Sequence, residues 1–201
     1  MSRIFRSPVL DTHMQSFIDK VFDREDFRET PPAGGEYENC VFKNCDFSGT
    51  DLSEIIFIEC EFVNSNLSLA KLPKTAFRDV MFRDCKMLGL HFEQCNDFGL
   101  AFSFEKCTLD HSSFYRMKLK QTSFRNTHLL EVDFTECDLT GSVFEHCDLT
   151  GAMFEHTVLE KADLRTSFNY SIDPENNRIK KARFSLSEVH GLLDKYDIAI
   201  E

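Results

Sequence analysis

Large apolar side chains recur at every fifth position over most of this chain, and small residues precede them by two positions. We call the large apolar position i. One series runs from Phe17 to Phe92, and a second runs from Phe104 to Leu164. Position i−2 is mostly Cys, Ser, Thr or Ala, and position i−1 is often Asp or Asn. Each pentad therefore reads small, polar, large apolar, and then two mostly polar residues.

A period of five fits neither an ordinary helix nor a flat strand. In an α-helix, five residues advance by about 500°, so successive i residues would drift around the axis. In a flat strand, an odd period would place successive i residues on opposite faces. The chain must instead turn once per pentad while i and i−2 stay inward. This pattern predicts a coil with short sides that stacks as a parallel β-solenoid.

Phenylalanine and leucine alternate strictly from Phe104 to Leu159. This super-period of ten residues requires an even number of sides in each turn. Four sides would place phenylalanine on one opposed pair of sides and leucine on the other. Of the 21 phenylalanines, 17 lie on the five-residue lattice when Phe184 is counted, so the bias toward this residue has a structural cause.

The pattern resembles the pentapeptide-repeat family, whose repeat reads Ala-(Asp/Asn)-Leu followed by two variable residues. The clearest matches are Cys45-Asp-Phe-Ser-Gly, Thr50-Asp-Leu-Ser-Glu, Cys137-Asp-Leu-Thr-Gly, Cys147-Asp-Leu-Thr-Gly and Ala162-Asp-Leu-Arg-Thr. The resemblance covers roughly residues 15–185. It implies an all-β fold, a right-handed quadrilateral parallel β-helix with four pentads per turn. About eight turns at ~4.8 Å would give a rod on the order of 40 Å long.

Shorter segments are similar to the branch of this family that protects DNA gyrase, which includes the quinolone-resistance Qnr proteins and the albicidin-resistance protein. These segments are Asn66-Leu-Ser-Leu, Pro73, Cys85-Lys-Met-Leu-Gly and Phe184-Ser-Leu. The resemblance implies a homodimeric rod whose shape and acidic surface imitate a DNA duplex. It also implies that the protein partner is DNA gyrase or topoisomerase IV.

The formal net charge of −11 and the pI near 5.1 bear on the choice of partner. An acidic chain is poorly suited to bind nucleic acid directly, because neutralisation of phosphates by Lys and Arg dominates such binding. It is equally unsuited to anionic lipid. The sequence shows neither a signal peptide nor a long apolar run, so we expect a cytoplasmic protein.

One side of the expected coil is a candidate partner-binding surface. Glu36, Glu38, Glu59 and Asp79 flank the i positions 37, 57 and 77, which share that side. The alternative is a solvated surface in which charges pair between turns, as expected for His111 with Glu131, Arg116 with Glu136, and Lys118 with Asp138. Residues 131–160 are also acidic, with eight acids and no Lys or Arg.

The register shifts by two residues between Phe92 and Phe104. An insertion in a solenoid must bulge outward, often on the binding face. We therefore expect a short insertion near residues 93–103, with Asp97, Phe98 and Gly99 at its tip. Asp97 and Phe98 are further candidates for partner contact, and the alternative is a tolerated surface irregularity.

Catalytic, metal and cofactor sites are not indicated. Seven of the eight cysteines occupy position i−2, and no Cys-x-x-Cys motif exists, so the cysteines are expected to pack as small apolar core residues. The seven histidines are scattered, and no phosphate-binding loop, G-x-S-x-G or H-E-x-x-H motif occurs. An enzyme is therefore a disfavoured third hypothesis.

The ends of the chain do not follow the lattice. Residues 1–14 are expected to form a flexible arm, and residues 15–184 the β-helix. Residues 185–201 are expected to form a capping α-helix and tail, because Ser185 and Glu188 have the spacing of a capping box. Apolar residues then follow at helical spacing. The candidates for a dimer interface are Val189, Leu192, Leu193, Tyr196, Ile198 and Ile200; the alternative is a simple lid.

Two functional hypotheses follow from the sequence. The first is a homodimeric DNA mimic that binds DNA gyrase or another type II topoisomerase and protects it from inhibitors. The second is a pentapeptide-repeat scaffold for another protein partner. Both are non-enzymatic, and neither requires a cofactor or contact with a membrane.

Overall fold

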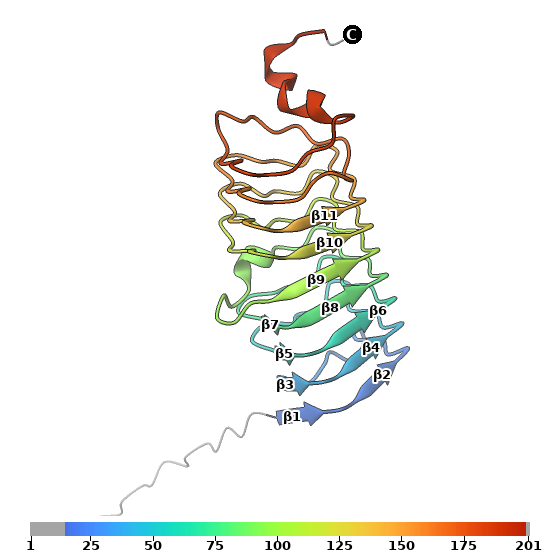
Figure 1. The fold of residues 1–201 in the computed structure, drawn as a ribbon. Helices are drawn as coiled ribbons and strands as arrows, with labels where there is room; N and C mark the ends of the chain where they lie inside the picture. Colours follow the sequence, from blue (N-terminus) through green and yellow to red (C-terminus); the bar gives the residue numbers. More distant parts are fainter. Residues whose placement is uncertain (1–14, 200–201) are drawn as a thin grey trace, which may run out of the picture.

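The computed structural model describes residues 15–199 and shows a parallel β-solenoid of about seven turns, against the roughly eight expected (Figure 1). The turns stack along one axis, with β1 at one end and the C-terminal segment at the other. Residues 1–14, the expected arm, and residues 200–201 lie outside the described range. The predicted all-β solenoid is confirmed.

Each turn has four sides, which we number as faces 1 to 4 in the order in which the chain visits them. Face 1 is a sheet of β1 (Gln15–Ile18), β3 (Gly35–Glu38), β5 (Ile56–Ile58) and β7 (Ala76–Arg78). Face 2 is a sheet of β2 (Val21–Asp23), β4 (Val41–Lys43), β6 (Glu61–Val63), β8 (Val80–Arg83), β9 (Phe102–Glu105), β10 (Ser123–Arg125) and β11 (Val143–Glu145). All pairs are parallel, as Phe22 with Phe42 on face 2 shows.

Faces 3 and 4 are held by single bridges between successive turns. Asp46 pairs with Asn66 on face 3, and Asp133 pairs with Met153 on face 4. The partners are 20 residues apart, which equals four pentads. The predicted four-sided turn is therefore confirmed.

The core is a ladder of stacked aromatic rings. On face 2, the Phe124 ring stacks on Phe144 with centroids 4.9 Å apart, and on face 4 Phe114 stacks on Phe134 at 5.4 Å. The two columns meet edge to face: the ring centroids of Phe124 and Phe134 are 6.0 Å apart, and their planes make an angle of 82°. Edge-to-face and offset-stacked rings are both favourable geometries. In this half of the rod, phenylalanine fills one opposed pair of faces and leucine the other, as the alternation predicts.

The corners explain how the chain turns once per pentad. The corner residue, at i+2, adopts a left-handed backbone conformation, as in Asn39 with φ 51° and Arg116 with φ 60°. This conformation is uncommon outside glycine. It is supported here by a hydrogen bond between turns, since the N–H of Arg116 donates to the carbonyl of Thr135 at 3.0 Å.

The small residues at i−2 are hydrogen-bond donors as well as core fillers. The Sγ of Cys137 donates to the carbonyl of Phe114 at 2.6 Å, and Ser142 and Thr157 donate to Leu119 and Phe134 in the same way. These three carbonyls also accept a backbone N–H within their own turn, from Met117, Thr122 and Cys137. The i−2 side chains therefore add a second hydrogen bond that links one turn to the next, a role that packing alone did not predict.

The insertion lies on face 1. Strands β8 and β9 pair with an offset of 22 residues, so Phe82 opposes Phe104, whereas other pairs are offset by 20. The 3-10 helix η1 (Phe92–Gln94) begins on face 4, where Phe92 stacks on Phe114. The loop that follows it replaces the next strand of face 1, and β7 is the last member of its sheet. Figure 1 shows this segment bulging from the wall of the rod.

The predicted C-terminal α-helix is wrong. The structure has two short 3-10 helices instead, η2 (Val189–Leu192) and η3 (Asp194–Tyr196). The N–H of Ile172 donates to the carbonyl of Gly191 at 2.8 Å, so the last turn of the solenoid engages an acceptor that an α-helix would use internally. Only half of the capping box forms: Ser185 Oγ accepts from the N–H of Glu188.

Truncation of a core ring tests the assignment of the i residues to the interior of the rod. We expect Phe134→Ala to lower the free energy of unfolding by about 3–5 kcal/mol, because it removes a buried ring and leaves a cavity. Thr135→Ala, next to it on the outer side, should change the free energy by less than about 0.5 kcal/mol. Denaturant titration measures both. Equal effects of the two substitutions would contradict the assignment.

Thiol labelling tests the inward position of the cysteines. Burial raises the pKa of Cys60, Cys137 and Cys147 from 9.0 to about 12. Folded protein should therefore react slowly with iodoacetamide at alkaline pH and rapidly once unfolded. Because the folded pKa is the higher one, stability is intact below pH 9 and should fall as the pH rises toward 12. Rapid labelling of all thiols in folded protein would disprove the burial.

Candidate partner-binding surfaces

The four predicted acidic residues lie together on the N-terminal half of face 1, and we call them the lower acidic cluster. Glu36 and Glu38 are on β3, on either side of the buried Tyr37. Glu59 and Asp79 occupy the corners that follow β5 and β7, both in the left-handed conformation. The alternation of inward and outward residues along each strand places these carboxylates on the outside.

Face 1 does not form one continuous acidic strip. On the next two turns, the position of Glu36 is occupied by Ile56 and then Ala76. The position of Glu38 is occupied by Ile58 and then Arg78. Beyond the insertion, the basic residues Lys118, Lys120, Lys161, Arg178 and Lys180 outnumber the acids Asp138 and Glu160, so this part of the face is net basic. Face 1 therefore changes from acidic to basic along the rod.

A second acidic area covers faces 3 and 4 in the C-terminal half, and we call it the upper acidic surface. Its members are Asp110, Glu131, Asp133, Glu136, Asp148 and Glu155. Between residues 108 and 156, the only Lys or Arg on these two faces and their corners is Arg116, which pairs with Glu136 at 2.7 Å. The composition of residues 131–160 signalled all of these acids except Asp110, but their grouping depends on the stacking of turns.

Local hydrogen bonds fix several of these carboxylates. Asp133 Oδ1 accepts from the N–H of Thr135 at 2.8 Å, and Asp148 Oδ1 accepts from Thr150 at 3.1 Å. Burial alone would raise the pKa of Asp148, but hydrogen bonds from Thr150 and Asn169 outweigh it, and the pKa is lowered. The hydrogen bond from Arg116 likewise lowers the pKa of Glu136. Asp148 and Glu136 are therefore charged at neutral pH.

The tip of the insertion projects into solvent. Phe98 is 74% exposed, and Asp97 beside it is also exposed. The guanidinium of Arg78 lies 5.5 Å from the centroid of the Phe98 ring. Gly99 has φ +69°, which favours glycine at this turn. The structure thus presents an aromatic ring and a carboxylate beyond the wall of the rod.

Two of the three expected pairs between turns are present. His111 lies 3.2 Å from Glu131, and Arg116 pairs with Glu136. The third predicted pair, Lys118 with Asp138, is wrong. The Nζ atom of Lys120 lies 3.2 Å from Oδ2 of Asp138 instead. Such exposed pairs contribute little to stability, about 0–1 kcal/mol.

The candidates for a dimer interface divide into two groups. Leu192 packs against the core, and Val189 and Leu193 are half-buried. Tyr196 is 49% exposed and Ile198 is 56% exposed. Ile200 lies outside the described residues. The segment is tied to the last turn by Lys195, whose Nζ contacts Asp173 at 2.7 Å and Glu175 at 2.6 Å.

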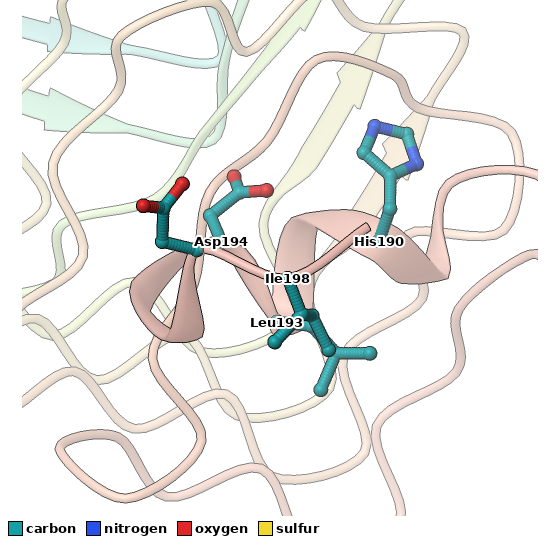
Figure 2. A pocket seen from close by; sticks show the side chains of 5 residues that line it. His190, Leu193, Asp194 and Ile198 are labelled. Atoms are coloured by element: carbon teal, nitrogen blue, oxygen red, sulfur yellow. The ribbon is translucent and has the colours of Figure 1, made fainter. Parts of the chain in front are cut away.

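A cavity of about 380 Å³ lies at this end of the rod (Figure 2). Its lining consists of His190, Leu193, Asp194, Asp197 and Ile198. Figure 2 shows the imidazole of His190 and the carboxylate of Asp194 pointing in different directions. The arrangement offers apolar and polar groups for contact.

Residues 15–199 contain no group of three or more His, Cys, Asp or Glu placed to hold a metal ion. Nor does any helix in that range have the length and apolar character needed to cross a membrane.

Comparisons with known proteins agree with this architecture. The family model described as "Pentapeptide repeat region" matches residues 36–102 and 90–164. No curated protein matches the chain.

Solved structures of similar fold include QnrB1, described as a plasmid-mediated fluoroquinolone resistance protein. A trypsin-treated variant of QnrB1 aligns over 93% of this chain and 92% of its own, with a TM-score of 0.60 and 14% identity. Full-length QnrB1 aligns over 92% of this chain and 100% of its own, with a TM-score of 0.47 and 20% identity. HetL, from the cyanobacterium Nostoc sp. strain PCC 7120, aligns over 84% of each chain, with a TM-score of 0.49 and 16% identity. At these identities, the similarity concerns the fold.

Proposed function

Because this chain belongs to the pentapeptide-repeat family, with matches over residues 36–102 and 90–164, we propose that it is a non-enzymatic protein-binding rod of the cytoplasm. More specifically, we propose that it imitates a DNA duplex, binds DNA gyrase or topoisomerase IV, and protects the enzyme from inhibitors. The upper acidic surface is the observation that carries this proposal.

The physical basis is a match of charge. A DNA duplex presents one negative charge for about every 1.7 Å of its axis, and DNA-binding surfaces are correspondingly basic. In the upper acidic surface, carboxylates recur on successive turns, which are about 4.8 Å apart. Glu131 and Asp148 supply charge from face 3 and its corner, and Asp133 and Glu155 supply it from face 4. A basic groove shaped for DNA would be attracted to this side of the rod.

The lower acidic cluster and the tip of the insertion are secondary candidates. Glu36, Glu38, Glu59 and Asp79 extend negative charge toward the N-terminal end. Asp97 and Phe98 could insert between side chains of the partner, since exposed aromatic residues are frequent anchors in interfaces. The fold shared with QnrB1 supports the same class of activity at the level of architecture.

A second candidate function is a scaffold for a different protein partner. The basic half of face 1 favours it, because Lys118, Lys161 and Lys180 would repel a DNA-binding groove. The two functions differ in which side of the rod makes contact, so substitutions on separate faces distinguish them.

We also propose that two copies associate through their C-terminal ends. Tyr196 and Ile198 are apolar and exposed beside the cavity at the end of the rod. A single self-complementary patch is most often paired by a two-fold axis. Such a dimer would roughly double the length of the acidic rod.

A supercoiling assay tests protection of a topoisomerase. We expect this protein to restore supercoiling by DNA gyrase in the presence of a quinolone or albicidin. Glu131→Gln with Glu155→Gln should weaken protection by about tenfold, because it removes two exposed charges of the upper acidic surface.

The matched control is Glu36→Gln with Glu38→Gln, which removes the same charge from the lower acidic cluster. Protection that survives neutralisation of the upper acidic surface but not of the lower cluster would move the contact to face 1. No protection by the unmodified protein, at any ratio to gyrase, would reject the topoisomerase partner.

Sedimentation tests the dimer. We expect Ile198→Asp, alone and with Leu193→Asp, to give a folded monomer, because charge at an apolar contact opposes association. The single substitution guards against unfolding, since Leu193 is half-buried. Leu69→Asp, which alters an exposed apolar residue far from this end, should leave the dimer intact. A monomeric unmodified protein at tens of micromolar would refute the proposal.

A further inference from the structure

We propose that face 1 of this chain binds face 1 of a second copy, with the two rods side by side and antiparallel. The lower acidic cluster of each copy lies against the basic half of face 1 of the other. The two-fold axis runs parallel to the strands, between the insertion and the turn of Met117–Thr122. This inference is independent of the topoisomerase activity and of the C-terminal association, since Tyr196 and Ile198 take no part in it.

The reversal of charge along face 1 is the first observation. Below the insertion the face carries the lower acidic cluster, and above it Lys118, Lys161 and Lys180 contribute to a net basic surface. A two-fold axis parallel to the strands reverses the direction of the rod and keeps each column of side chains opposite the same column of the second copy. It therefore brings acid to base at both ends of the contact. Parallel rods would bring acid to acid, and like charges across an interface oppose binding.

The register of the turns makes this match specific. The insertion, β7, β5 and β3 are the first to fourth turns below the axis. The first to fourth turns above it are marked by bridged residues, Lys118, Asp138, Val158 and Arg178. Glu38 on β3 therefore meets Lys180, which occupies the same column four turns above the axis. The corner residue Glu59, which follows β5, likewise meets the corner residue Lys161.

The four charges that meet in these two pairs have no partner within their own copy. All four are exposed, and none of them forms an ion pair with another residue in the range 15–199. Their neighbours differ, because Arg178 already pairs with Glu160 at 2.6 Å and Lys120 with Asp138 at 3.2 Å. The contact therefore pairs charges that are otherwise unmatched, and it breaks no existing ion pair.

Apolar and aromatic groups lie between these charges on the same face. Ile56 on β5 meets Val158, and both are half-buried in the single copy. Phe98 is 74% exposed and lies in the insertion, next to the axis. Its ring lies 5.5 Å from the Arg78 guanidinium of its own copy, and it meets the turn of Lys118 in the other, where a second cation can contact an aromatic ring. The long side chains of glutamate and lysine span the gap that the bulge of the insertion leaves between the two faces.

The contact is weak and depends on salt. About seven turns at ~4.8 Å, by about four residues at ~3.3 Å, give on the order of 450 Å² per copy. Each partner contributes more, about 800 Å², to an interface of standard size. Salt also screens exposed ion pairs, so we expect a dissociation constant on the order of 100 µM at low salt. Because only face 1 is covered, the upper acidic surface on faces 3 and 4 stays accessible in this dimer.

Sedimentation of the Ile198→Asp variant isolates this contact, because that substitution opposes the C-terminal association. At about 20 mM salt we expect the dimer to be the main species at about 500 µM protein. At about 500 mM salt the same samples should be monomers, since salt screens the exposed charges. A variant that stays monomeric at low salt, or a dimer that persists at high salt, would overturn the proposal.

Reversal of charge tests the pairing in the same background. Lys161→Glu with Lys180→Glu makes face 1 acidic, and we call this protein the acidic variant. Glu38→Lys with Glu59→Lys gives the basic variant. Each should self-associate about tenfold more weakly than the parent, because like charges meet. The labelled acidic variant should bind the basic variant about tenfold more tightly than it binds itself, since every reversed charge then meets a reversed partner.

The matched control reverses two charges of the upper acidic surface. Glu131→Lys with Glu155→Lys changes the net charge as much as the basic variant does and leaves face 1 intact. It should bind the labelled acidic variant about tenfold more weakly than the basic variant does. Equal binding of the two would overturn the assignment to face 1. Lysine and glutamate already occupy left-handed corners, as Lys74 and Glu131 do, so the exchanges at corners should not disturb the fold.

Cysteine crosslinking tests the antiparallel register. Glu59→Cys on one copy and Lys161→Cys on the other should form a disulfide at low salt with diamide as the oxidant. Glu59→Cys alone should not, because the two copies of residue 59 are about five turns, or ~24 Å, apart, which is beyond the reach of a disulfide. A disulfide formed as readily by Glu59→Cys alone as by the mixture would overturn the register.

Discussion

Register between turns is the constraint on which the rest of this structure depends. Outside the insertion, each residue lies above the one 20 positions earlier, as Phe144 lies above Phe124, and the left-handed corner residues maintain that spacing. Backbone hydrogen bonds then connect successive turns along the faces, and large apolar side chains stack in columns. The aromatic ladder, the thiol and hydroxyl donors at i−2, and the rows of surface charge all follow from this one repeat.

The same constraint explains where the rod departs from regularity. Two additional residues before Phe104 would misalign every later turn if they were spread along the chain. Instead, face 2 keeps its pairing through β8 and β9, and the disruption is confined to face 1. Local loss of a strand preserves the remaining ladders, but it leaves the edge at Lys118 and Lys120 without a partner. The irregular site is thus a consequence of a regular scaffold.

Charge is distributed by face and by position along the rod. The lower acidic cluster and the basic half of face 1 occupy the same side, whereas the upper acidic surface lies on faces 3 and 4. Different faces of one rod therefore carry different charge. The C-terminal segment contributes a third surface, where Tyr196 and Ile198 are exposed.

The sequence by itself determined the architecture, because a five-residue period is a local property that every pentad repeats. It predicted the four faces, the inward phenylalanines such as Phe134, and the place of the insertion before Phe104. Only the tertiary structure decided which groups from different turns meet. It showed that Cys137 donates to Phe114 and that Lys120 rather than Lys118 reaches Asp138. It also showed that five of the eight acids of residues 131–160 form a surface with Asp110, while the other three lie on faces 1 and 2. It also replaced the expected α-helix by 3-10 helices, because the last turn binds the carbonyl of Gly191. Such partners lie far apart in the sequence, so no local pattern encodes them.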